Sequence, residues 1–207
     1  MSDIFLFDSR IRAEGFDIIA GIDEAGRGPL AGPVVASAVI LGENDIIPGV
    51  KDSKKLTRKR IKSLFRDIVS KSVSIGVGII DSTEIDKVNI LNATKKAMTA
   101  AVKDLSVTPR LLLIDALTLE NCDIAQKSLI KGDNRSASIA AASIIAKYVR
   151  DSIMQHYHTL YPVYGFDKHN GYGTKLHMEK INEYGPCPIH RRSFSPVMSL
   201  SLPYGDA

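Results

Sequence analysis

The sequence predicts an α/β domain in which a mixed central sheet is flanked by helices and followed by a helical C-terminal region. Short runs rich in Val, Ile and Leu alternate with longer segments whose apolar residues recur every three or four positions, as in strands and amphipathic helices. The first two strand-like runs follow each other without a helix, which indicates a hairpin. The later runs are separated by helical segments, which indicates a parallel portion of the same sheet.

Apolar periodicity places each element along the chain. Five strands are predicted, at residues 18–22, 34–41, 73–80, 110–114 and, as a shorter run, 124–130. The runs at 73–80 and 110–114 are rich in Ile, Val and Leu, so both are expected to be buried. Helices are predicted at residues 57–69, 90–105, 137 to about 157, and 175–184. Residues 162–173 and 185–196 carry Gly, Pro, Tyr and His and are predicted to be substrate-facing loops.

Length and composition indicate one globular domain. The 207 residues are 44% hydrophobic and 24% charged, so we expect a single domain over residues 1–207, with residues 160–207 as its substrate-facing region. The apolar runs are too short to cross a bilayer and the N-terminus lacks a secretory signal pattern, which predicts a cytoplasmic protein without membrane contact. No heptad pattern is present, so a monomer is expected. Cys122 and Cys187 are too few for a zinc site or a disulfide framework.

The basic residues are clustered, although the formal net charge is only +4 and the pI is about 9.0. Arg191 and Arg192 follow His190 near the C-terminus. A larger cluster lies in one short stretch and consists of Lys51, Lys54, Lys55, Arg58, Lys59, Arg60 and Lys62. Such clusters suit a polyanion such as nucleic acid. The alternative is a solvated helix face and a basic tail without a binding function.

Residues 18–33 carry the strongest functional signal in the chain. An apolar strand-like run leads into two adjacent acids, Asp23 and Glu24, and then into a Gly-Arg-Gly segment. Two carboxylates at the end of a buried strand are costly unless a cation or a partner offsets their desolvation. The glycines permit a positive φ and a close approach of a ligand to the backbone, and Arg27 offers a planar set of donors. The alternative is a helix cap followed by an ordinary turn.

Two further acids are expected near the same place. Asp115 ends the strand at 110–114, and because strand ends in an open α/β sheet share a crevice, it can meet Asp23. Asp133 directly precedes the long Ala-rich helix, whose N-terminus favours a negative charge. Its alternative is a helix-start residue without chemistry.

Hard oxygen ligands without a Cys or His cluster select Mg²⁺ or Mn²⁺ over zinc. Two such ions stabilise both the attacking water and the leaving oxygen in an in-line displacement at phosphorus. The sequence therefore predicts a metal-dependent phosphodiester hydrolase with Mn²⁺ or Mg²⁺ as cofactor. A histidine base is not required, so the five histidines are expected to be structural or to face phosphate.

Several motifs, taken in order, resemble the ribonuclease HII family over nearly the whole chain. They are residues 21–33 (GIDEAGRGPLAGP), 52–56 (DSKKL), 113–115 (LID), 131–133 (KGD), 138–147 (SIAAASIIAK), 168–174 (KHNGYGT) and 188–194 (PIHRRSF). Any one motif is weak, but their order and spacing together are specific. The related ribonuclease HIII carries an additional N-terminal domain and lacks the Gly-Arg-Gly turn, so the resemblance favours type HII. One departure is Ala116, where many bacterial relatives have glycine.

The resemblance implies a ribonuclease H-like fold and an endonuclease acting on RNA–DNA hybrids and on duplex DNA that contains ribonucleotides. Such enzymes cut the RNA strand of a hybrid and nick DNA on the 5′ side of a single embedded ribonucleotide, leaving 3′-hydroxyl and 5′-phosphate ends. The four acids that hold the divalent ions in that family correspond to Asp23, Glu24, Asp115 and Asp133.

The resemblance also implies a set of substrate-binding residues. A Gly-Arg-Gly turn matching Gly26, Arg27 and Gly28 contacts the backbone at the ribonucleotide. A tyrosine matching Tyr172 senses the junction between the ribose and the following deoxyribose, although taken alone this residue is more readily interpreted as an aromatic that packs a loop. Phosphate contacts are expected from Lys54, His190 and Arg191.

Two other functions remain open from the residues. A non-catalytic hybrid-binding module would use the basic clusters, but a polyanion binder has no reason to place four acids in its groove. A Mg²⁺-dependent phosphatase acting on a small substrate would use the acids, but separate basic clusters favour a long ligand.

Overall fold

Five strands form one sheet, in the order β3-β2-β1-β4-β5. The computed structural model describes residues 3–43, 45–50 and 56–200. The strands are β1 (Ile19–Ala25), β2 (Val34–Leu41), β3 (Ser72–Ile80), β4 (Leu111–Asp115) and β5 (Ala125–Leu129). Strands β1, β2 and β3 pair antiparallel, whereas β1, β4 and β5 pair parallel. The predicted hairpin and parallel portion are therefore confirmed.

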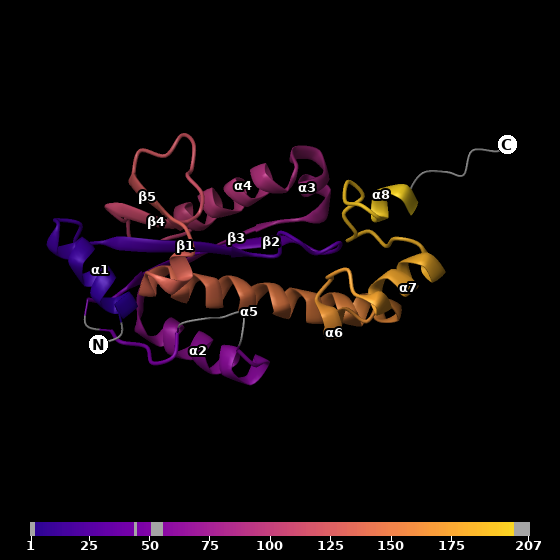
Figure 1. Cartoon of the computed structure of the whole chain (residues 1–207), viewed down its shortest axis with the longest axis horizontal. Helices are drawn as coiled ribbons and strands as arrows, with labels where there is room; N and C mark the ends of the chain where they lie inside the picture. The colour runs from indigo at the N-terminus through magenta and orange to yellow at the C-terminus, as the bar shows by residue number, and fades with distance from the viewer. Residues whose placement is uncertain (1–2, 44, 51–55, 201–207) are drawn as a thin grey trace.

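Helices cover both faces of the sheet (Figure 1). Helices α3 and α4 lie on one face and α1, α2 and α5 on the other, while α6, α7 and α8 gather at one end of the molecule. Their bounds are α1 (Asp3–Ala13), α2 (Arg58–Lys71), α3 (Ser82–Val88), α4 (Ile90–Lys103), α5 (Ala137–Leu160), α6 (Phe166–His169), α7 (Lys175–Tyr184) and α8 (Val197–Leu200). Two single-turn 3₁₀ helices, η2 (Gly132–Asn134) and η3 (Pro162–Tyr164), flank α5. Among the described residues, no helix is both long enough and apolar enough to span a bilayer.

Strand β1 extends further than its apolar run indicates. Its parallel pairing with β4 ends at Ile22 opposite Ile114, but its antiparallel pairing with β2 continues to Ala25 opposite Val35. Asp23 and Glu24 therefore lie on a strand that outruns its parallel neighbour, and Asp115 stands at the end of that neighbour.

Helix α5 packs on β1 at very short range. A Cβ built on Gly21 would lie 2.0 Å from the carbonyl carbon of Ser138, so only glycine permits this approach. The Ala-rich first half of α5 is buried, and this close packing places the residues that follow beside the carboxylate end of β1.

Among the described residues, four α-helices were not predicted from the sequence: α1, α3 and the four-residue helices α6 and α8, of which α6 lies in the segment 162–173 that was predicted to be a loop. The buried face of α1 includes an acid, Asp8, which accepts hydrogen bonds from the N–H (2.8 Å) and the hydroxyl (2.7 Å) of Ser138 at the start of α5. An acid in the middle of the apolar stripe obscures the helical period. Helix α3 carries a readable start signal, because Asp81 accepts the N–H of Glu84 at 2.8 Å in an Asp-x-x-Glu pattern.

The expectation that residues 73–80 are buried is wrong. Strand β3 lies at the edge of the sheet, and Val73 and Ile79 are 54% and 51% exposed. Strand β4 lies inside the sheet and its apolar residues are buried, as predicted. A run of β-branched residues does not distinguish the two cases, because an edge strand uses the same residues on its inner face.

Candidate active site

Asp23, Glu24 and Asp115 form an electrostatically coupled group at the ends of β1 and β4. Asp23 is 7% exposed, and its Oδ1 accepts the N–H of Glu24 at 2.7 Å. The Ser143 hydroxyl on α5 also hydrogen-bonds to its carboxylate. Burial raises the pKa of Asp23 well above its usual range, and the negative charges of Glu24 and Asp115 raise it further. The predicted meeting of Asp115 with Asp23 is confirmed.

A backbone contact links Asp133 to this group. Oδ1 of Asp115 accepts the N–H of Gly132 at 2.7 Å, which fastens η2 against the end of β4. Asp133, one residue further on, is 5% exposed, and its Oδ1 accepts the side-chain amide of Asn134 at 3.0 Å. Asp133 thus lies on a turn held by Asp115 and just ahead of α5.

The chemistry of this group fits a hard divalent cation. The mutual repulsion that raises the pKa of Asp23 is the interaction that a bound cation removes. The side chains of these three acids and of Asp133 all offer oxygen, the donor that Mg²⁺ and Mn²⁺ prefer. In the described part of the chain, no three or more His, Cys, Asp or Glu side chains are already spaced as a metal site.

The Gly26–Gly28 turn follows directly after the acids. Gly26 is buried at φ +97°, and a Cβ there would lie 2.1 Å from Nε of Arg150, so this position requires glycine. Arg27 is exposed, and its guanidinium lies 3.4 Å from Glu24 Oε1. Gly28 is exposed as well, and a Cβ there would meet only Cε1 of Tyr172, at 3.9 Å. The turn thus presents bare backbone opposite the Tyr172 ring.

Arg191 lies beneath this turn and not on the surface. It is fully buried, and its guanidinium donates to the carbonyls of Gly26, Arg27 (2.9 Å), Gly32 (3.0 Å) and Pro33 (3.2 Å). His190 beside it is 2% exposed. The predicted phosphate contacts of these two residues would require the turn to move, whereas a role in holding the turn needs no movement.

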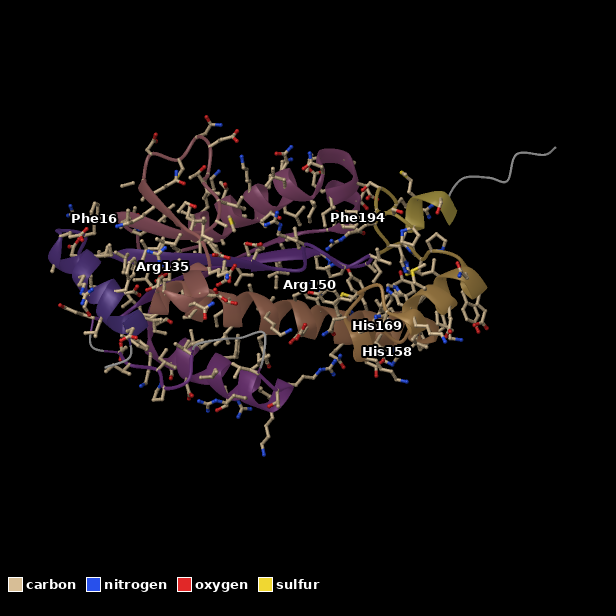
Figure 2. The ribbon with its side chains drawn as sticks, viewed as in Figure 1. Phe16, Arg135, Arg150, His158, His169 and Phe194 are labelled. Carbon is tan, nitrogen blue, oxygen red and sulfur yellow. The ribbon has the colours of Figure 1, made fainter. Side chains whose placement is uncertain are left out.

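Arg150 is a second buried cation under the same turn, and sequence reasoning missed it. It is 1% exposed and donates to the carbonyls of Ala31 (3.1 Å), Pro33 (2.9 Å) and Asn170 (3.0 Å). It therefore joins the glycine-rich segment to the loop before Tyr172. Figure 2 shows Arg150 on α5 and His169 in α6 in the same part of the molecule.

A pocket of about 260 Å³ lies between Glu24, Gly26 and helix α5. Its lining comprises Glu24, Ala25, Gly26, Ser143, Lys147, Arg150, Asp151 and Tyr172. Tyr172 is 49% exposed, and Lys147 pairs with Asp151 at 3.1 Å. Ser143, Lys147 and Arg150 stand four and three residues apart, so they share one helix face. That spacing of polar residues in a largely buried Ala-rich helix is the signal that could have identified them.

Part of the predicted basic cluster is described by the structure. Arg58, Lys59, Arg60 and Lys62 are exposed on α2, and Arg58 donates to the carbonyl of Asp167 ahead of Tyr172. Lys51, Lys54 and Lys55 lie outside the described residues, so the role of Lys54 stays a prediction.

Ala116 directly follows the third acid and adopts φ +52°. This left-handed conformation costs a non-glycine residue about 1–2 kcal/mol. We expect Ala116→Gly to raise the free energy of unfolding by about 0.5–1 kcal/mol, since the greater flexibility of glycine in the unfolded chain offsets part of the gain. Urea unfolding measures this change in the free energy of unfolding. Ala125→Gly, in the extended backbone of β5, is the matched control and should lower the free energy of unfolding. A lower free energy of unfolding in Ala116→Gly as well would contradict the proposed strain at Ala116.

Three buried histidines, His169, His177 and His190, lie behind Tyr172 in one cluster. The pKa values of His177 and of His190 are lowered to about 4, chiefly by burial, and the neighbouring histidines and Arg192 contribute to the lowering. Burial also raises the pKa of the adjacent Cys187 thiol to about 11, so it stays protonated. These histidines are therefore neutral in the folded protein at neutral pH.

The lowered pKa values predict a loss of stability in acid. Between pH 6.5 and 4 His177 and His190 become protonated in the unfolded chain but stay neutral in the folded protein. The free energy of unfolding therefore falls as the pH is lowered through this range. The raised pKa values of Asp8 and Asp23 act in the opposite direction. The histidine contribution is measured as the fall in Tm from pH 7 to pH 5 in the wild type, minus the same fall in His177→Phe. We expect a difference of several degrees, since 1 kcal/mol corresponds to roughly 2–4 °C in Tm. Equal differences would contradict it.

The chain is similar to known proteins over most of its length. The family model described as ribonuclease HII matches residues 20–197. The chain is 53% identical over 193 residues to ribonuclease HII of Acetivibrio thermocellus, covering 93% of this chain and 75% of that protein. It is 54% identical over 196 residues to ribonuclease HII of Chlamydia pneumoniae, covering 94% and 91%.

Solved structures have the same fold. The crystal structure of ribonuclease H2 from Pyrococcus horikoshii matches with a TM-score of 0.74 at 28% identity, covering 88% of this chain and 96% of that one. A ribonuclease HII from Archaeoglobus fulgidus, solved in complex with PCNA, matches with a TM-score of 0.73 at 24% identity, covering 86% and 95%. Bst-RNase HIII in complex with Mn²⁺ matches with a TM-score of 0.69 at 21% identity, covering 88% and 68%. By the family model and these close relatives, the chain belongs to the ribonuclease HII family of metal-dependent ribonuclease H enzymes.

Proposed function

We infer that this protein cuts the RNA strand of RNA–DNA hybrids and nicks duplex DNA on the 5′ side of a single embedded ribonucleotide, leaving 3′-hydroxyl and 5′-phosphate ends. The observation that carries this proposal is one pocket bordered by an acid of the coupled group, the Gly26–Gly28 turn and the exposed ring of Tyr172. The acids suit metal-dependent phosphodiester hydrolysis. The bare turn and the ring opposite it suit recognition of a sugar-phosphate backbone.

Asp23, Glu24, Asp115 and Asp133 would hold the divalent ions. Mg²⁺ or Mn²⁺ there supplies activation of water and stabilisation of the leaving oxygen. The related ribonuclease HIII that was solved with Mn²⁺ makes manganese the first metal to test. The residues of this chain contribute the placement: Ser143 orients Asp23, and the contact between Asp115 and Gly132 holds the turn that carries Asp133.

Two buried guanidinium groups support phosphate binding at the turn. Arg150 and Arg191 bond the carbonyls of the glycine-rich segment, which leaves its exposed part free for a ligand. Their positive charges lie under the turn in a low-dielectric setting, where electrostatic interactions are stronger than in water. We therefore assign Arg191 to holding the turn and leave direct contact with the substrate to Gly26, Arg27 and Gly28.

Recognition of a single ribonucleotide requires a group that detects one 2′-hydroxyl, since nothing else distinguishes that residue from its neighbours. We assign this role to Tyr172, and the assignment is supported by its half-exposed ring, which lines the pocket and faces Gly28. Arg150 lies 5.9 Å from the centre of its ring and bonds the loop before it. The exposed basic side chains of α2 and residues 160–200 would then extend the contact along the duplex.

The other functions receive less support. A pure binding module leaves the coupled acids without a purpose, since they repel a polyanion. A partner is a separate question: the Archaeoglobus fulgidus relative forms a complex with PCNA, whereas for this chain we propose a monomer.

The test is a cleavage assay on duplex DNA that contains one ribonucleotide, with and without Mg²⁺ or Mn²⁺, mapped to single-nucleotide resolution. A metal-dependent nick immediately 5′ of the ribonucleotide is the expected result. If only long hybrids are cleaved, the result would support the metal-dependent chemistry and contradict the junction role of Tyr172. Tight binding without cleavage would favour the binding module.

A further inference from the structure

A directed hydrogen-bond relay of two buried histidines runs behind the pocket. Nδ1 of His177 lies 2.9 Å from the carbonyl oxygen of Tyr172, and a carbonyl only accepts, so this nitrogen carries the proton. In a neutral imidazole Nε2 of His177 is then an acceptor. Nε2 of His190, 3.0 Å away, must donate to it. Nδ1 of His190 is left to accept, and the N–H of Cys187 lies 2.9 Å from it.

The relay connects the two sides of the proposed recognition site. One end holds the backbone of Tyr172, whose ring faces Gly28. The other end holds the segment of Cys187–Arg191, in which Ile189 accepts the N–H of Gly32 at 2.8 Å and Arg191 bonds the glycine-rich turn. A shift of either side would therefore break a buried hydrogen bond.

Neither metal binding nor simple packing accounts for this arrangement. The two Nε2 atoms face each other at hydrogen-bonding distance and Cys187 lies on the opposite nitrogen of His190, so the side chains do not converge on one point as metal ligands do. Apolar packing would not need two imidazoles in complementary tautomers with every ring nitrogen bonded. Buried polar networks of this kind specify one arrangement when all their members are satisfied.

We propose that His177 and His190 are positioning residues that fix the Tyr172 backbone relative to the Gly26–Gly28 turn, and thereby set the preference for a ribonucleotide–deoxyribonucleotide junction. The relay touches no substrate. This proposal rests on the proposed function, because it concerns how the same site discriminates between its substrates.

The test compares kcat and KM on two substrates, duplex DNA with one ribonucleotide and an all-RNA strand hybridised to DNA. His177→Phe retains a ring and removes both polar atoms. We expect it to lower kcat/KM about tenfold on the single ribonucleotide, since misplaced groups of this kind cost up to about 10²-fold, and less than threefold on the hybrid. A substrate-independent loss is what a merely structural role would produce.

Two conservative variants separate the ends of the relay. His177→Asn places an amide N–H near the position of Nδ1 and retains the donor to Tyr172, whereas His177→Gln places its amide near Nε2 and retains the partner of His190. The junction preference should recover further in His177→Asn, since its amide bonds the tyrosine backbone. The opposite order would overturn the proposal.

Tyr164→Phe is the matched control within the same cluster. It removes the hydrogen bond from the Tyr164 hydroxyl to the carbonyl of Gly185 (2.8 Å) and leaves the relay intact, so Tm should fall without a change in substrate ratio. If wild type nicks the single ribonucleotide and His177→Phe changes both substrates equally, only the relay proposal fails. If wild type does not nick it, the proposed junction function fails and the relay proposal fails with it.

Discussion

Asp115→Asn is expected to reduce cleavage of both substrates by about 10³-fold or more while the protein stays folded. Loss of one carboxylate from the metal group removes several kcal/mol of transition-state stabilisation, and each 1.36 kcal/mol is a factor of ten in rate. The fold should persist because the amide oxygen of asparagine still accepts the N–H of Gly132, the contact that holds the turn of Asp133. The measurements are kcat at saturating Mn²⁺ and Tm.

A second readout addresses metal binding directly. Titration of Mn²⁺ followed by calorimetry should show weaker binding in Asp115→Asn than in the wild type. Asp123→Asn makes the same change in charge at an exposed loop position and should alter neither property. Retained turnover in Asp115→Asn would contradict a metal-binding role for Asp115.

Tyr172→Ala is expected to reduce nicking at a single ribonucleotide by about 10²-fold, with a much smaller loss in duplex affinity. The ring lines the pocket and lies beside the bare backbone of Gly28, so its removal takes away the group proposed to orient the junction and leaves the metal group intact. Half of the side chain is solvent-exposed, which limits the effect on stability. The assay is kcat/KM on the single-ribonucleotide duplex, together with binding of uncleavable DNA.

Two controls define what the ring contributes. Tyr172→Phe separates the aromatic face from the hydroxyl. Tyr184→Ala removes a tyrosine of similar exposure, 52%, on α7 and outside the pocket, so its activity should match that of wild type. Equal losses of cleavage and of affinity in Tyr172→Ala would refute the junction role.

Much of the fold could be read from periodicity. The order of strands and helices, the hairpin and the parallel portion followed from local apolar patterns, because each element must bury one face. Helix α1 could not be found in this way, since Asp8 is buried only through its bonds to Ser138 in α5. The edge position of β3 was equally hidden, because strand order is a property of the whole sheet.

The candidate site shows the same division. The acids were identified because apolar strands that end in carboxylates are conspicuous in sequence, and the coupling of Asp23 with Asp115 is consistent with their placement. Arg150, Arg191 and the histidine pair were not identified in their structural roles, because a buried arginine bonded to carbonyls has the same local sequence as an exposed one.

The sequence by itself therefore determined the α/β class, the membership in the ribonuclease HII family and the acids proposed for chemistry, since these depend on residue type and local order. Only the tertiary structure decided which polar residues are buried and what they bond. Arg191 is distant in sequence from the Gly26–Gly28 turn and bonds it only when β1, α5 and the C-terminal segment are assembled, and His190 pairs with Ala31 further along the same glycine-rich segment. The buried Arg191 guanidinium bonds the carbonyl oxygens of the turn because desolvated donors must find partners within the protein.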